Sequence, residues 1–185
     1  MKKLSKIEII ETQHKLSKMF LVRREGAAKW LMIDAMWSNS LKKFEALGIS
    51  EGEISALIVT HIHADHLGLA KKLDVRWLGT AEERERLEYI NGWFADPSHD
   101  KRGDWIHINE EDVELIAQQN LAEISAEIGL SIEIEATPGH TPDSLSVIVS
   151  DGDIKIAFVG DADLTDLKTK VDYVQQSHHE MIKQS

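Results

Sequence analysis

The chain has 185 residues and a formal net charge of -11, and 42% of its residues are hydrophobic and 29% charged. This profile is typical of a single globular domain, residues 1–185, and excludes two domains of ordinary size. The absence of cysteine excludes disulfides and thiolate metal sites, and the negative charge disfavours DNA or RNA as a partner.

The N-terminal third predicts strands followed by a helix. Lys2, Lys3 and Lys6 give a basic start, but no apolar stretch follows that would complete a signal peptide or span a membrane, so we expect a cytoplasmic protein with no membrane partner. Apolar runs predict strands over residues 7–9, 19–22 and 30–33. Apolar residues at helical spacing predict a helix over 40–47.

The middle of the chain alternates strands and helices. A buried strand is predicted over residues 54–59, a short helix over 67–73 and a strand over 75–78. Thr80 is a plausible N-cap for the helix that follows. Residues 91–105 are aromatic-rich without clear periodicity, which predicts a long loop, either a substrate lid or a flap docked on the core.

The last third predicts a sheet followed by a helix. A strand and a helix are expected over residues 112–128, and a further strand over 132–136. Asp151-Gly152 is a strong turn signal and predicts a hairpin of residues 144–149 and 154–159. From Asp163 to the end the sequence reads as a polar helix. The alternation indicates an α/β class with a sheet-on-sheet core and helices outside.

The most informative run is Thr60-His61-Ile62-His63-Ala64-Asp65-His66, which places three imidazoles and a carboxylate directly after a buried strand. Such groups are ordinary ligands of zinc, iron and manganese, so the run predicts a dinuclear metal site. A histidine-rich surface loop is the alternative, which the buried strand before the run disfavours.

In three further segments, a possible metal ligand follows an apolar strand. His140 sits at the tip of a turn rich in proline and glycine, Asp161 follows an apolar strand and a glycine, and Asp34 closes another apolar strand. Ligands at strand ends are held rigidly by the sheet, which a dinuclear centre requires. A turn or capping role is the alternative for Asp34.

Together these positions resemble the metallo-β-lactamase-fold hydrolase superfamily. The resemblance rests on Asp34, the run from His61 to His66, His140 within Thr-Pro-Gly-His-Thr and Asp161 within Val-Gly-Asp. It implies a four-layer αβ/βα sandwich with the metals at one edge of the two sheets.

The resemblance also implies a role for each matched residue. His61, His63 and His140 would hold the first metal. The second metal would be held by Asp65, His66 and Asp161, with Asp161 bridging both ions. Asp65 and Asp34 would serve catalysis, Asp65 by steadying the nucleophile and shuttling a proton, and Asp34 by orienting the cluster through hydrogen bonds.

The implied activity is that of a metal-dependent hydrolase that uses a metal-bound hydroxide on a small ester, thioester, lactone or lactam. The implied cofactors are two divalent ions, with zinc expected before iron or manganese. The alternative is a catalytically impaired metal-binding module with a role in assembly. Neither the substrate nor the metal follows from the residues.

The sequence departs from the family pattern after Asp161, because no late strand with one more histidine follows. We expect a domain that is C-terminally short, lacks the last strand and helix, and has a weaker second metal site. His178, His179 or a partner chain could supply the absent ligand. An uncovered sheet edge also favours a homodimer.

Overall fold

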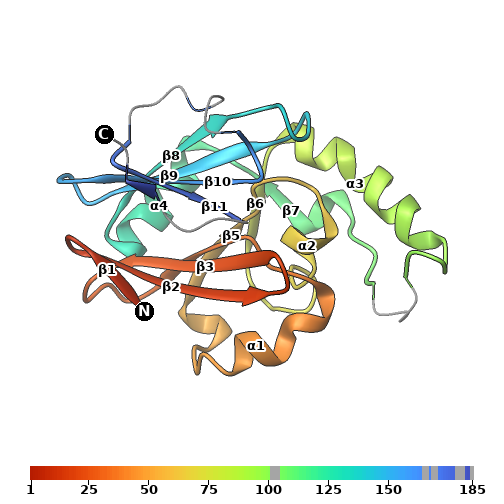
Figure 1. The fold of residues 1–185 in the computed structure, drawn as a ribbon, viewed down its shortest axis with the longest axis horizontal. Coiled ribbons are helices and arrows are strands. Elements are labelled where there is room, and N and C mark those ends of the chain that lie inside the picture. Colours follow the sequence, from red (N-terminus) through yellow and green to blue (C-terminus); the bar gives the residue numbers. More distant parts are fainter. Residues whose placement is uncertain (101–104, 164–166, 168–170, 178–181, 184–185) are drawn as a thin grey trace.

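Two mixed β-sheets pack face to face because strands of both sheets carry apolar side chains toward the space between them. The computed structural model describes residues 1–100, 105–163, 167, 171–177 and 182–183. Among these residues the first sheet has the order β1-β2-β3-β4-β5-β6-β7 and the second the order β12-β11-β10-β9-β8 (Figure 1).

The strands of the first sheet are β1 (Lys2–Leu4), β2 (Ile7–His14), β3 (Ser17–Arg24), β4 (Trp30–Ile33), β5 (Ile54–Ile58), β6 (Trp77–Gly79) and β7 (Val113–Leu115). Those of the second sheet are β8 (Ser131–Ala136), β9 (Leu145–Ser150), β10 (Lys155–Gly160), β11 (Tyr173–Gln176) and β12 (Ile182–Lys183). The helices are α1 (Leu41–Glu45), α2 (Ala64–Leu67), α3 (Ala81–Ala95) and α4 (Gln118–Ile128), with short 3-10 turns at Ser38–Ser40, Glu51–Glu53 and Glu110–Asp112.

The strand directions bring several loops to one edge of the sandwich. Strands β4, β5, β6 and β7 run parallel, and β10 runs parallel to β11. The loops that follow the carboxyl ends of β4 and β5 therefore emerge at the same edge. Strands β8, β9 and β10 are antiparallel, so the loop between β8 and β9 lies at the opposite end of β9 from the β9–β10 turn.

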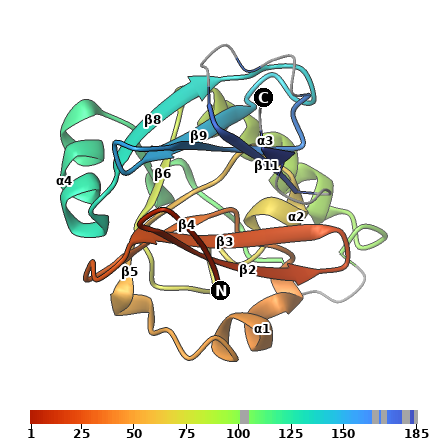
Figure 2. The ribbon, with the colours of Figure 1, turned by 60° about the vertical axis from the view of Figure 1, so that its left-hand side comes forward.

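One hydrophobic core fills the space between the sheets. Phe20 of β3 and Phe158 of β10 meet there with ring centroids 5.1 Å apart. On the outer face of the first sheet, Phe44 of α1 and Leu87 of α3 join a second cluster. Helix α4 adds Ile124 and Ile128 to the inter-sheet core and lies away from α2 and α3 (Figure 2). These layers confirm the predicted α/β sandwich.

Three boundary predictions are wrong. The short helix expected over residues 67–73 is instead α2, which begins at Ala64 inside the histidine run. Helix α3 continues to Ala95, so the first residues of the expected loop 91–105 are helical. The helix expected from Asp163 is contradicted at Tyr173–Gln176, which forms β11 because Val174 and its neighbours are buried against β10.

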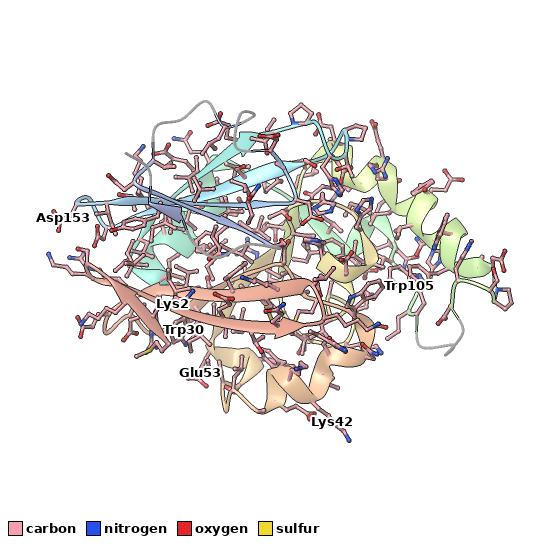
Figure 3. All side chains as sticks on the ribbon, in the orientation of Figure 1. Lys2, Trp30, Lys42, Glu53, Trp105 and Asp153 are labelled. Atoms are coloured by element: carbon pink, nitrogen blue, oxygen red, sulfur yellow. The ribbon has the colours of Figure 1, made fainter. Side chains whose placement is uncertain are left out.

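The segment after α3 packs back onto that helix within its described residues 96–100 and 105–109. Trp93 stacks on His99 with centroids 3.8 Å apart, and Phe94 stacks on Trp105 at 4.1 Å. The buried Asn91 side chain bonds both the N–H and the carbonyl of Ile108. The structure therefore favours a docked flap over a free lid for this part of the chain (Figure 3, Trp105).

No helix in the described part of the chain is long and apolar enough to cross a membrane.

Replacing Phe158 with Ala should lower the free energy of unfolding by about 3–5 kcal/mol, because the large side chain is 1% exposed between the two sheets and leaves a cavity. Urea denaturation measures the change. The control is Leu16→Ala, a side chain 67% exposed, which should stay within about 0.5 kcal/mol of wild type. Equal losses for the two variants would contradict this account of the core.

Candidate metal centre

Four loops from the two sheets converge at one edge of the sandwich. They follow β4, β5 and β10, and connect β8 to β9. Each carries at least one residue predicted from the sequence: Asp34, the run His61–His66, Asp161 and His140 respectively. The structure thus brings together side chains that are far apart along the chain.

One group consists of three histidines. His61, His63 and His140 each offer a ring nitrogen, and these nitrogens lie within 4.8 Å of one another. His61 Nε2 is 3.1 Å from His63 Nδ1, which is 3.2 Å from His140 Nε2. This is the set predicted for the first metal.

A second group shares His61 with the first and adds His66 and Asp161. Oδ1 of Asp161 is 3.5 Å from His66 Nε2, and Oδ2 is 3.7 Å from His140 Nε2, so this carboxylate lies between His66 and His140. Asp65 lies farther out, with Oδ2 4.0 Å from His66 Nε2. His178 and His179, named as candidate replacement ligands, are outside the described residues.

Asp34 fixes the orientation of His66. Its side chain is buried at 1% exposure and accepts from the ring Nδ1 of His66 at 2.9 Å. It also accepts from the backbone N–H of Thr60 at 2.7 Å and from the Thr60 hydroxyl. Asp34 adopts a left-handed backbone conformation with φ 57, which aspartate tolerates better than most residues.

The protonation states of the histidines differ with their surroundings. Burial, followed by the charges of His66 and His63, lowers the pKa of His61 well below its usual value. Burial and then His140 lower the pKa of His63. Both rings are therefore neutral near pH 7 and offer lone pairs.

His66 behaves in the opposite way. Burial lowers its pKa, but the charge and hydrogen bond of Asp34, together with the nearby carboxylate of Asp161, outweigh burial and raise it to about 10. Carboxylates that hold a proton this firmly on a buried ring would equally favour a metal cation beside it.

The donor set fits divalent metal ions. His66 Nε2 is buried and has no hydrogen-bond partner within the described part of the chain, while its Nδ1 is bonded to Asp34. This is the usual arrangement of a metal-binding histidine, whose second nitrogen is held by a carboxylate. Ligands about 2.0–2.1 Å from a tetrahedral zinc ion lie about 3.3 Å apart, close to the spacing of the three-histidine group.

Sequence reasoning assigned no role to three residues near the centre. Thr60 is 1% exposed, and its hydroxyl contacts Asp34 and the rings of His61 and His66. Asp143 accepts from the backbone of Ile62, and Arg86 of α3 pairs with Asp143. Thr60 and Asp143 stood inside the motifs already noted, but Arg86 had no local signal.

Comparison with known proteins assigns a family. A family model described as the metallo-beta-lactamase superfamily matches residues 16–184. A comparison with curated protein sequences gives no match.

Solved structures share this fold at low sequence identity. A metallo-beta-lactamase from Cronobacter sakazakii aligns with a TM-score of 0.59 and 19% identity, covering 86% of this chain and 71% of that chain. A beta-lactamase from Chitinophaga pinensis aligns at 0.60 and 17%, covering 88% and 72%. AidC, described as a dizinc quorum-quenching lactonase in complex with a product, N-hexnoyl-L-homoserine, aligns at 0.54 and 18%, covering 78% and 56%. These likenesses show the fold.

Gly160, directly before Asp161, should tolerate no side chain. It has φ +57, and an added Cβ would overlap the Thr60 hydroxyl. Gly160→Ala should therefore lower the free energy of unfolding by about 1–3 kcal/mol for backbone strain, and by a further amount for the overlap. Urea denaturation measures both contributions together.

Gly48→Ala is the matched control, because Gly48 has a similar positive φ (+67) but nothing within 4 Å of an added Cβ. It should lose only the strain contribution. A Gly160→Ala variant no less stable than Gly48→Ala would show that the contact with Thr60 is not tight.

Proposed function

The chain belongs to the metallo-beta-lactamase superfamily, and from this membership we propose that it is a metal-dependent hydrolase with a dinuclear centre. His61, His63 and His140 would hold one divalent ion, and His66, Asp161 and Asp65 the other. The observation that carries the proposal is the buried Nε2 of His66, which lies 3.5 Å from Asp161 and has no hydrogen-bond partner among the described residues, while Asp34 holds Nδ1.

Divalent ions bound at this edge would lower the pKa of water to about 7 and polarise a substrate carbonyl. The residues of the chain do the rest. Asp65, with its side chain 23% exposed, would take up and return a proton at its carboxylate. Asp34 would keep the His66 ring in one orientation.

The exposure of the ligands defines the side from which a substrate would approach. His61 and His66 are buried, whereas the side chain of His140 is 35% exposed and His63 is half-buried. A substrate would therefore reach the centre over His63, His140 and Asp65.

The substrate we propose is a small ester, thioester, lactone or lactam. Lactamases and a lactonase share the fold, and the net charge of -11 disfavours a nucleic acid. Zinc is the proposed metal because the donors are imidazole nitrogens and carboxylates, although iron and manganese accept the same donors.

Metal binding should depend on the histidine group. We expect His63→Ala to lose most of the zinc retained by wild-type protein after gel filtration, measured by mass spectrometry on tag-free protein. The control is His99→Ala, an exposed ring that stacks on Trp93 in the flap after α3 and should leave the metal content unchanged.

The two ions should also differ in affinity. The three-histidine group has short separations, whereas Asp65, a proposed ligand of the other ion, lies 4.0 Å from His66. Zinc titration should therefore give one tight and one weaker ion per chain. Two equally tight ions would contradict this ranking.

Hydrolysis should require Asp65. With zinc bound, Asp65→Asn should lower turnover by at least about 100-fold on a panel of chromogenic esters, thioesters, lactones and lactams, because an amide cannot carry the proton. Its urea midpoint should stay near that of wild type. Near-wild-type turnover with verified metal content would refute the role of Asp65. Zinc-loaded wild type without turnover on the whole panel would favour a metal-binding module instead.

A further inference from the structure

Two loops from different sheets are tied together on both sides of His61. The backbone N–H of Leu145 donates to the carbonyl of Thr60 at 2.9 Å. The backbone N–H of Ile62 donates to Oδ2 of Asp143 at 2.7 Å. The loop that carries His140 and the first residue of β9 therefore hold the residues directly before and after His61.

Asp143 is an unusual residue for such a contact because its side chain is 0% exposed. A buried carboxylate is costly unless a countercharge and hydrogen bonds offset its lost hydration. Arg86 of α3 supplies the countercharge, with Nε 2.8 Å from Asp143 Oδ1, and its own side chain is 25% exposed. The Ile62 amide supplies the hydrogen bond.

Helix α3 is itself fixed in position at this point. Glu83, one turn before Arg86, is fully buried, and its Oε2 accepts from the backbone N–H of Thr80 at 2.6 Å, which caps the helix. Thr80 directly follows β6. Arg86 therefore reaches Asp143 from a helix anchored to the first sheet.

We propose that Asp143 is a positioning residue of the metal centre. Its carboxylate, neutralised by Arg86, holds the segment from His61 to His63 against the loop of His140 and thereby sets the affinity of the three-histidine group for a divalent ion. The inference rests on the proposed function, since it requires that these histidines bind metal. It adds Asp143 and Arg86 to the residues on which the centre depends.

Removing the carboxylate tests the proposal directly. Asp143→Ala should weaken zinc binding by about 10–100-fold, measured by competition with a chromogenic chelator, because the residues around His61 lose their anchor. Asp143→Asn should lose less, since its amide oxygen can still accept from Ile62. Arg86→Met should also weaken binding, and the double variant Asp143→Ala/Arg86→Met should bind no more weakly than Asp143→Ala.

Asp151→Ala is the matched control. Asp151 also accepts a backbone N–H from a distant segment, that of Lys6 at 3.0 Å, but it lies in the β9–β10 turn. Figure 3 labels Asp153 of this turn at the opposite end of the molecule from Trp105. Asp151→Ala should lower the urea midpoint while its zinc affinity stays within twofold of wild type.

The outcomes separate the two proposals. A wild-type protein that binds no zinc would overturn the proposed function. Zinc-binding wild type with Asp143→Ala and Asp143→Asn both within twofold of it would overturn the positioning role alone. Should Asp143→Ala fail to fold, Asp143→Asn and Arg86→Met decide: wild-type affinity in both overturns the positioning role, and a loss of threefold or more in Arg86→Met supports it.

Discussion

The buried carboxylate of Asp34 is the constraint on which the candidate metal centre depends. It is 1% exposed at the end of β4 and accepts from the backbone of Thr60 and the ring of His66. A buried carboxylate requires such donors, so the bonds that satisfy Asp34 also fix the start of the histidine run. Gly160 leaves space for the Thr60 hydroxyl that completes this arrangement.

The centre is assembled from both sheets, so its geometry follows from how the sheets pack. The contact of Phe20 with Phe158 belongs to a close-packed core that resists sliding of one sheet over the other. At the edge, the bonds from Leu145 at the start of β9 to Thr60 and from Ile62 to Asp143 join the histidine run to the second sheet and its loop. Ligands from distant segments are held in this way by a rigid frame.

The histidines of the centre differ in the charge that their surroundings favour. His61 and His63 are kept neutral by burial and by one another, which leaves their lone pairs available. His66 lies between carboxylates that favour a positive charge at that position. The side chain of His140 lies on the side open to solvent. The buried rings of His61 and His66 therefore provide rigidity, and the side of His140 provides access for a substrate.

The sequence by itself determined the strands that precede the ligands, the hairpin at Asp151-Gly152 and the identity of the donor groups, because burial patterns and turn residues act locally. The sequence pattern predicted too early an end for α3, and it predicted a helix at Tyr173–Gln176. This segment is a strand because it pairs with β10. Only the tertiary structure decided that His61 belongs to both ligand groups and that Arg86 meets Asp143. Such contacts join elements from separate parts of the chain. A local sequence pattern does not predict them, because they depend on how the two sheets pack.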